Sequence, residues 1–399
     1  MPLTLETLLA PVGRDIFEQR HWEHEPVVLR GTSPDCLAGL FDLDDADRII
    51  HSSGLRGPTY RVVKDQQDLP AEAFSMPKLG WGSDSVTNFA EGNRLMAQLR
   101  DGASILFGSM HRLWGPVAEA CRLVEETWGW PVAANGYLTP PRSVGFNAHW
   151  DYQSLLVLQT AGEKTWRLYR PTMPLPLKHQ VCPPGGLDDP GELFMEVSLK
   201  RGDVLYVPRG WIHQAFSQEQ TSLHVALSIM PTTWMDVFQN LLNSMADDVR
   251  FRAPVSIPIT HAGDLRQVDE DRFDTLLAAF TERADADDGC EAIARRFVAT
   301  RLPAMRGTLN ELDSHDSVRA DSLLRRRTGV IYRIENHGEQ CHLLFQGQTM
   351  KLPWELVNAV RFVSEAAAFS PEQLPAEMPL EEKVAMCRSL LALGFLTWA

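Results

Sequence analysis

The sequence predicts an α+β protein in which a β-rich unit is followed by a helical region and a smaller mixed unit. Three observations lead to this fold class. Short strand-like runs with Pro and Gly turns fill residues 131–231, helical patterns fill 232–315, and strands beside two helices fill 316–399. We therefore expect three domains, and the first, 1–231, carries an N-terminal elaboration that contains helices.

The first 130 residues mix helical and extended patterns. The stretch GRDIFEQRHWEHEPVVLRG (13–31) predicts a short amphipathic helix, which a break at Pro26 separates from a strand. The stretch TNFAEGNRLMAQLRDGASILFGSM (87–110) predicts a helix, an Asp-Gly turn and a strand. In GPVAEACRLVEETWGW (115–130), apolar residues recur at helical spacing and predict a second helix.

From residue 131 the pattern changes to strands. The runs are VAANGYLTPP (132–141), SVGFNAHWDYQSLLVLQTAGEKTWRLYRP (143–171), ELFMEVSLKRGDVLYVPRGWIHQAF (192–216) and TSLHVALSIMP (221–231). Many short strands separated by regular turn signals are typical of an all-β barrel or sandwich. In this segment FNAHWDYQSLL (146–156) is unusual, because it places His and Asp inside a run that otherwise predicts a buried strand.

Residues 232–315 predict helices. The first, within TTWMDVFQNLLNSMADDVRFR (232–252), begins at a Thr that can cap it. Its apolar residues are expected on one face, namely Trp234, Val237, Leu241, Leu242 and Met245. The pattern alone favours packing within the domain over a dimer surface.

The segment 316–399 predicts strands within 329–353 and helices within 353–366 and 379–396. This combination suggests a winged-helix-like module. Such modules often bind DNA through a basic recognition helix, whereas these helices carry more acidic than basic side chains. We expect packing or protein contacts here and no direct DNA binding.

Bulk composition narrows the class of protein further. The chain has 399 residues and a net charge of −14, so most of its surface should repel nucleic acid and could attract a basic partner. Its six cysteines are widely spaced without a CxxC pair, which favours a reducing compartment over a disulfide framework. The sequence has no signal-peptide pattern and no apolar run long enough to span a bilayer. We expect a cytoplasmic protein that does not enter the membrane.

The unusual polar residues of the 146–156 run suggest a metal site. Residues i and i+2 of a strand project to the same side, so His149 and Asp151 should point together, with Trp150 opposite. His213 is the best third ligand, because the tight turn of GDVLYVPRGWIHQ (202–214) would hold it at a barrel mouth. Two His and one carboxylate form the facial triad of non-haem Fe(II) oxygenases, although zinc with a water would also suit them. His224 is expected to be structural or to support the ligands.

These residues resemble the JmjC-domain ribosomal oxygenases, which are cupin-like hydroxylases dependent on Fe(II) and 2-oxoglutarate. The similarity rests on HWD…LQ.AGEKTWRLYRP, GDVLYVPRGWIHQA and TSLHVALS, and extends to the N-terminal HWEHEPVVLRG and to the three-part order of the chain. The resemblance implies a double-stranded β-helix (cupin, jelly-roll) barrel, then a helical dimerisation region, then a winged-helix-like C-terminal domain. It also implies a homodimer.

The resemblance also assigns roles to single residues. It implies that His149, Asp151 and His213 are the iron ligands and catalytic residues, and that Lys164 pairs with the distal carboxylate of 2-oxoglutarate. A buried cation for a dicarboxylate is physically reasonable. Further cosubstrate hydrogen bonds are implied for three positions, which are Asn135, Tyr137 and Ser228.

The implied activity is hydroxylation of an Arg or His side chain of a ribosomal protein, in which dioxygen and 2-oxoglutarate are consumed and succinate is released. The acidic balance suits a basic ribosomal partner. The alternatives are the same chemistry on another peptide, a small metabolite or a tRNA base, a zinc cupin enzyme without 2-oxoglutarate, and a non-catalytic protein-interaction module. The neutral Tyr152, Gln153 and Ser154 replace acidic residues common in the family, at positions expected near the substrate entrance.

Overall fold

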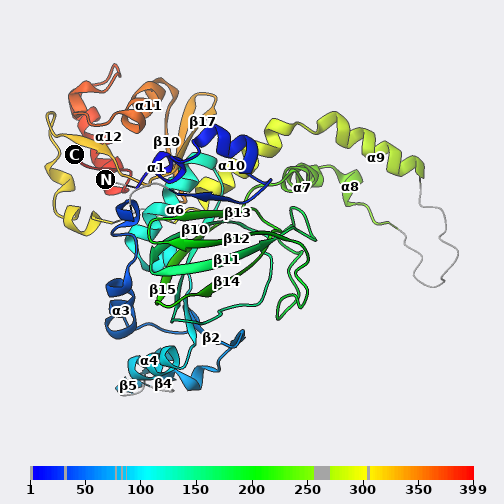
Figure 1. Cartoon of the computed structure of the whole chain (residues 1–399). Helices are drawn as coiled ribbons and strands as arrows, with labels where there is room; N and C mark the ends of the chain where they lie inside the picture. The colour runs from blue at the N-terminus through cyan, green and yellow to red at the C-terminus, as the bar shows by residue number, and fades with distance from the viewer. Residues whose placement is uncertain are drawn as a thin grey trace. The chain divides into compact units, whose positions relative to one another are not determined.

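The computed structural model forms two compact units, Met1–Pro231 and Thr232–Ala399 (Figure 1). The residues that it describes are 3–30, 34–76, 79–81, 84–86, 88–255, 270–302 and 306–399. We describe each unit by itself.

The larger sheet of the first unit has eight strands, and every neighbouring pair is antiparallel. In spatial order they are β1 (Val27–Leu29), β13 (Val204–Val207), β10 (Ser154–Ala161), β15 (Ser222–Ile229), β9 (Val132–Thr139), β8 (Ser104–Phe107), β2 (Tyr60–Lys64) and β3 (Gln67–Asp68). The sheet therefore recruits β1, β2, β3 and β8 from the N-terminal elaboration to extend the strands of the β-rich segment.

A second sheet of three antiparallel strands faces the first. Its order is β12 (Leu193–Lys200), β11 (Glu163–Tyr169) and β14 (Ile212–Ser217). Side chains from both sheets form one core between them, namely Leu155, Val157, Trp166, Leu168, Leu199, Leu205, Val207, Trp211 and Ala226. Two antiparallel sheets that share a core are the jelly-roll arrangement expected from the sequence.

Strand β10 shows why the central strands are apolar on both sides. Leu155 and Val157 point into the core between the sheets, while Leu156 and Leu158 join a second core on the outer face of the large sheet. That outer core also contains helical side chains such as Val117 and Val124. A strand covered on both faces has no alternating polar pattern, which explains its continuous apolar run.

The N-terminal elaboration supplies the covering helices, as predicted. These are α1 (Leu5–Leu9), α2 (Arg14–Ile16), a π-helical turn (Phe17–His21), α3 (Leu43–Ser52), α4 (Gly92–Arg100), α5 (Met110–Leu113) and α6 (Gly115–Trp128). Short strands pair as β4 (Ser75–Met76) with β7 (Phe89–Ala90) and β5 (Leu79–Trp81) with β6 (Asp84–Val86). An aromatic cluster fixes the N-terminal turn to α6, since Trp22 stacks on Trp128 and Trp130 with ring centroids 5.2 and 4.8 Å apart.

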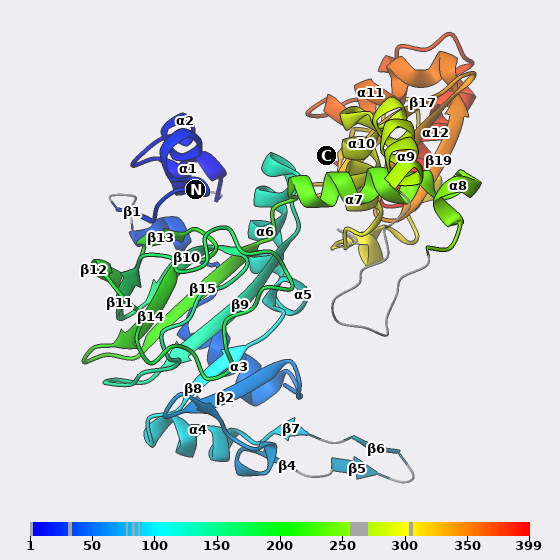
Figure 2. The same cartoon turned by 90° about the vertical axis from the view of Figure 1, so that its right-hand side faces the viewer.

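The second unit begins with helices. They are α7 (Trp234–Ser244), α8 (Val249–Arg252), α9 (Glu270–Arg283) and α10 (Ala286–Ala299). Thr233 caps α7 in a capping box with Asp236, as the sequence predicts. Helix α7 packs against α10 (Figure 2), where a Cβ on Gly289 would lie 2.9 Å from Val237 Cγ1. Glycine at this position therefore permits the close approach.

The apolar face predicted for α7 is divided in the structure. Val237, Leu241 and Met245 are buried, whereas Trp234 is 70% exposed and Leu242 is 50% exposed. The prediction of a single apolar face is wrong, because α7 buries one stripe against α10 and leaves a second one open.

The rest of the second unit combines strands and helices. Its strands are β16 (Leu324–Arg326), β17 (Tyr332–His337), β18 (Gln340–Phe345), β19 (Gln348–Pro353) and β20 (Leu396–Trp398), and its helices are α11 (Val357–Glu365) and α12 (Leu380–Ala392). Helix α10 contacts β17 and β18, and all of these elements belong to one compact unit. The winged-helix likeness remains a prediction. Among the helices in the described ranges, none is both long and apolar enough to cross a bilayer.

Candidate metal centre

Three side chains meet at one end of the space between the two sheets. His149, Asp151 and His213 each offer one ligand atom, and these atoms all lie within 4.8 Å of one another. The Nε2 atom of His213 is 3.7 Å from Oδ2 of Asp151. The three residues suggested by the sequence are therefore brought together, at a spacing that one metal ion could bridge.

The two histidines are joined through their backbones. His149 N donates to His213 O at 3.1 Å, and His213 N donates to His149 O at 2.8 Å. This reciprocal pair is an isolated antiparallel bridge. His149 lies outside β10, because that strand begins only at Ser154. The predicted strand over 146–156 is thus wrong for its first eight residues. Extended backbone at the bridge still points His149 and Asp151 the same way.

Each imidazole is oriented by a backbone carbonyl. The Nδ1 atom of His149 is 2.7 Å from Asn147 O, and the Nδ1 atom of His213 is 3.0 Å from Trp211 O. A proton on Nδ1 that is donated to a carbonyl leaves the lone pair on Nε2 for a metal. Burial, and then the neighbouring His149, lower the pKa of His213 to about 4. His213 is therefore neutral at pH 7, as a metal ligand must be.

Lys164 is a buried cation on β11 that no described carboxylate pairs with. Its Nζ atom donates to Thr139 Oγ1 at 2.9 Å, and burial lowers its pKa to about 7. His213 pairs with Leu168 and Lys164 pairs with Ser217 along the same two strands. The backbone positions of Lys164 and His213 are therefore about 13 Å apart along the strand direction. Both side chains lie on the inner face of this strand pair.

The other predicted cosubstrate positions also face inward. Asn135 and Tyr137 lie on β9 and Ser228 on β15, with side chains on the same inner face as Ala226. Asn135 Oδ1 accepts from Ser109 N at 3.1 Å. Burial, and then the charge of Asp151, raise the pKa of Tyr137 to about 12, so its phenol stays a hydrogen-bond donor.

His224 packs in the middle of this inner face. Its ring stacks on Tyr137 with centroids 4.8 Å apart and meets Trp166 edge-on at 5.5 Å. Burial, and then the charge of Lys164, hold the pKa of His224 well below its usual value. The ring is outside the group of potential ligands, which fits the structural role expected for it.

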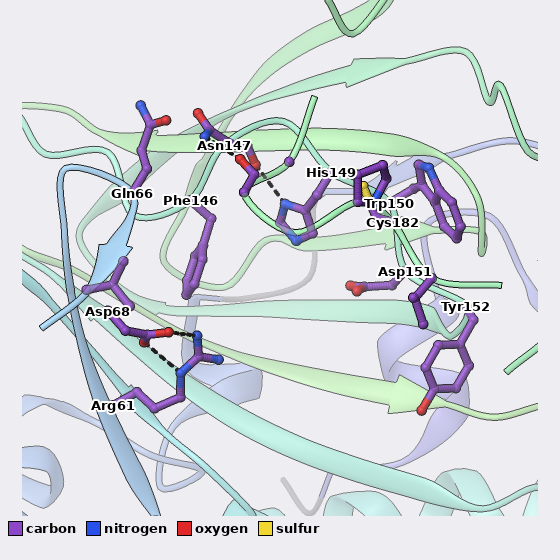
Figure 3. A pocket seen from close by; sticks show the side chains of 15 residues that line it. Arg61, Gln66, Asp68, Phe146, Asn147, His149, Trp150, Asp151, Tyr152 and Cys182 are labelled. Carbon is purple, nitrogen blue, oxygen red and sulfur yellow. Dashed lines mark hydrogen bonds and ion pairs between the residues drawn. The ribbon is translucent and has the colours of Figure 1, made fainter. Parts of the chain in front are cut away.

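A pocket of about 350 Å³ opens at the candidate metal centre (Figure 3). His149, Asp151 and Tyr152 line one part of it, and Phe146 and Arg61 stand opposite. The remaining lining residues are Val63, Gln66, Asp68, Asn147, Trp150, Val181, Cys182, Pro183, Gly185 and Gly186.

Only part of the expected entrance lies at this pocket. Tyr152 lines it, as predicted, but Ser154 is fully buried and its Oγ accepts from Arg209 N at 3.2 Å. The prediction for Ser154 is wrong because β10 begins there and turns the side chain into the protein.

One wall of the pocket, formed by β2 and β3, was not predicted from the sequence. Arg61 forms a two-pronged ion pair with Asp68, with Nε–Oδ1 and Nη2–Oδ2 distances of 2.8 and 2.6 Å. The guanidinium also lies 5.9 Å from the ring centroid of Phe146. Arg61 and Asp68 precede the β-rich segment, which begins at residue 131, by more than sixty positions, and no motif connects them to it. The adjacent β-branched Val62 and Val63 of β2 are typical of a strand, but they do not indicate where in the sheet that strand lies.

Comparison with known proteins finds a JmjC domain in this chain. The JmjC domain family model matches residues 115–237, which contain all three candidate ligands. Residues 115–237 therefore belong to a JmjC domain with a cupin-like fold. The predicted double-stranded β-helix and the predicted resemblance to the ribosomal oxygenases are confirmed.

Curated relatives of this chain have names that are more specific than that of the domain family. The chain is 31% identical to human ribosomal oxygenase 1 over 322 residues, which are 75% of this chain and 48% of that protein. It is also 31% identical to the bifunctional lysine-specific demethylase and histidyl-hydroxylase NO66 of Drosophila persimilis. This match extends over 233 residues, which are 56% of this chain and 31% of that protein. The chain thus spans half or less of the length of these curated relatives.

A solved structure matches nearly the whole chain. This is the structure of the Escherichia coli ribosomal oxygenase YcfD in complex with cobalt and 2-oxoglutarate. The match covers 96% of this chain and 97% of the YcfD chain. The TM-score is 0.55 at 18% sequence identity. A likeness at this identity concerns the fold alone.

The geometry predicts that each of the three side chains is needed to bind a divalent metal. Cobalt(II) titrated into the protein, followed by its visible absorption, should bind the native chain and fail to bind the His149→Ala, Asp151→Ala and His213→Ala variants. His315→Ala removes an imidazole that is 40% exposed and serves as the control. Unchanged affinity in the Asp151→Ala variant would contradict the proposed ligand set.

Proposed function

We propose that this chain is an Fe(II)- and 2-oxoglutarate-dependent oxygenase that hydroxylates an Arg or His side chain of a ribosomal protein in the cytoplasm. The observation that carries the proposal is the joint presence, on one inner face, of the His149–Asp151–His213 group and the buried Lys164. The first could hold a metal and the second a carboxylate.

The donor set suits iron(II). Two imidazoles and one carboxylate leave one face of an octahedral ion open for a cosubstrate and dioxygen. Both Nδ1 atoms already face carbonyl groups, so both Nε2 atoms are available to the ion. When bound, iron(II) together with 2-oxoglutarate supplies the oxidising chemistry that places an oxygen atom on a C–H bond. The side chains of the protein hold the metal and orient the substrate.

Lys164 supports 2-oxoglutarate as the cosubstrate. A buried ammonium without a carboxylate partner is unfavourable, and its lowered pKa reflects that cost. An incoming distal carboxylate would satisfy it, with Thr139 already holding Nζ in place. The proximal end of the dicarboxylate would then lie toward His213, further along the same strand pair.

The pocket favours histidine over arginine as the target. A guanidinium entering the pocket would require a carboxylate partner. Among the described lining residues the carboxylates are Asp68, which Arg61 already occupies, and Asp151, which we assign to the metal. A neutral imidazole needs no such partner and could pack beside Phe146. The histidyl-hydroxylase in the name of the NO66 relative agrees with this preference.

A ribosomal protein as the substrate rests on the relatives and on charge. The relatives are named ribosomal oxygenases, and the net charge of this chain is −14. Ribosomal proteins are basic, so opposite charge would speed their association.

We also propose a homodimer formed through the second unit. On α7 an apolar stripe of Trp234, Met235, Phe238 and Leu242 stays exposed, each side chain by at least half. On α9, Phe273 and Leu277 are similarly exposed. Exposed apolar stripes of this kind are typical of interaction surfaces. A second copy of the chain presents the same stripe, and a two-fold axis would cover both at once.

The 2-oxoglutarate proposal predicts a specific defect for Lys164→Met. This change should weaken 2-oxoglutarate binding at least tenfold and leave cobalt(II) affinity within about threefold, because the metal ligands are untouched. Titration calorimetry of each component measures both. Lys200→Met, on the exposed side of neighbouring β12, is the matched control. Equal losses for metal and cosubstrate would contradict the assignment.

The same lysine predicts the pH dependence of cosubstrate binding. The pKa of Lys164 is about 7 in the free protein, and a bound carboxylate should raise it. Affinity should therefore be greatest below pH 7 and fall as the pH rises above 7, with proton uptake on binding. Calorimetry at pH 8 in two buffers of different ionisation enthalpy measures the uptake. Binding without proton uptake would show that Lys164 is not the partner.

The substrate proposal predicts a mass change in one ribosomal protein. Intact-mass spectrometry of ribosomes from cells with and without this chain should show a protein that loses the mass of one oxygen atom in the deleted strain. Complementation with Asp151→Ala should not restore the mass, whereas the native chain should. Fragmentation should place the oxygen on histidine. An oxygen on arginine would contradict the pocket argument, and an unchanged set of masses would contradict the ribosomal substrate.

The dimer proposal predicts that Phe238→Asp yields a monomer. A carboxylate in the middle of the exposed α7 stripe would be desolvated in a dimer and should weaken it strongly. Light scattering coupled to size-exclusion chromatography gives the mass in solution. Leu309→Asp changes a side chain that is 81% exposed and lies outside α7 and α9, and this variant is the control. A native chain that is monomeric at all concentrations would contradict the proposal.

A further inference from the structure

A buried ion pair connects the N-terminal elaboration to the turn that precedes His213. Glu23 Oε2 accepts from Arg209 Nε at 2.8 Å and from Nη2 at 2.6 Å. The Arg209 side chain is only 8% exposed and the Glu23 side chain 18%. Glu23 has a φ of 61°, which is uncommon for a residue with a side chain. The backbone thus adopts an unfavourable conformation at the residue that forms the pair.

Both members of the pair have their remaining polar groups satisfied. Arg209 Nη1 donates to the carbonyls of Leu175 and Pro176 at 3.3 and 3.1 Å. Glu23 Oε1 accepts from Ser154 Oγ at 3.3 Å, and Glu23 N donates to Tyr206 Oη at 3.0 Å. A buried charge pair contributes to a specific geometry only when its groups are saturated in this way.

The pair reaches Asp151 through the backbone. Ser154 follows Asp151 by three residues, and its Oγ accepts from Arg209 N. Gly210, the residue after Arg209, donates its N–H to the backbone oxygen of Asp151 at 2.8 Å. Gly210 has a φ of +85°, and a Cβ there would lie 2.3 Å from Met173 O. The turn that carries Arg209 therefore has little freedom to move away from Asp151.

A second contact reaches His213. Trp211 Nε1 donates to His24 O at 3.2 Å, and Trp211 O is the carbonyl that orients His213 Nδ1 at 3.0 Å. Glu23 and His24 are consecutive, so two neighbouring residues of the N-terminal elaboration hold the backbone beside two of the candidate ligands. Only the contact with His213 Nδ1 involves a side chain of the metal group, and the other contacts act on the backbone beside it.

We propose that Glu23 and Arg209 are a positioning pair, which sets the geometry of the metal centre by fixing the backbone around Asp151 and His213. The inference rests on the proposed metal site and is independent of the choice of cosubstrate and substrate. It assigns to the N-terminal elaboration a role at the metal centre, in addition to covering the outer face of the large sheet.

The test is cobalt(II) binding by the full-length Glu23→Gln variant in the absence of 2-oxoglutarate. This variant keeps the size of the side chain and removes its charge. Residues that orient metal ligands typically change metal affinity about 10- to 100-fold when replaced, and we expect a loss in this range with an altered cobalt absorption spectrum. The matched control is Glu219→Gln, which removes an exposed ion pair with Arg142 in the same unit. It should change neither readout.

Thermal unfolding of the metal-free variants separates stability from positioning. A folded Glu23→Gln protein with native cobalt affinity and spectrum would overturn the proposal, whatever its melting temperature. If Glu23→Gln does not fold, Trp211→Phe removes the hydrogen bond to His24 O and keeps a smaller aromatic ring in the core. A shifted cobalt spectrum in Trp211→Phe supports the proposal, and an unchanged spectrum overturns it. Because no turnover is measured, failure of the oxygenase proposal would leave these outcomes intact.

Discussion

The reciprocal backbone bridge between His149 and His213 is the contact on which the candidate metal centre depends. A hydrogen-bonded antiparallel pair brings two Cα atoms within about 5.5 Å, which no side-chain contact would do as reliably. The two ring centroids accordingly lie 4.4 Å apart. Once the bridge has formed, the extended backbone directs Asp151 to the same side as His149. A single backbone pairing between two distant segments therefore defines the positions of all three side chains.

The inner face beyond the His149–His213 bridge buries two basic side chains, Lys164 and His224. Lys164 and His224 lie in a space whose walls are Trp166, Tyr137 and apolar strand residues. Burial lowers the pKa of both basic groups and raises that of Tyr137. All three shifts favour the neutral forms, so a space of this kind is poorly solvated. An anion would be bound more strongly there by a single ammonium than at the protein surface, because solvent screening is weak.

Local patterns predicted the strands and the shared direction of His149 and Asp151, whereas the jelly roll and the iron ligand set with His213 were implied by the family resemblance. Alternation and turn signals indicate strands, and the spacing of His149 and Asp151 needs only an extended backbone. The start of β10 was misplaced, since the apolar run SLLVL continues directly from HWDYQ without a turn residue between them. Arg61, Asp68 and Glu23 could not be placed at the site. Their proximity arises from sheet order, with β2 and β3 at one edge and the N-terminal turn at β13, and order among distant strands leaves no periodic signal.

The metal centre and the pocket differ in how they are held, and this difference has a consequence for specificity. His149 and His213 are oriented by carbonyl groups, and Asp151 by a peptide N–H, so their geometry depends on the path of the backbone. The opposite wall includes the side chains of Arg61 and Asp68, from the β2–β3 hairpin, and of Phe146. Substitutions in that wall would change the charge and shape presented to a substrate without moving the ligands. The fold can therefore keep the metal ligands in place while the side chains of the pocket wall change, and in this chain that wall carries the paired Arg61 and Asp68.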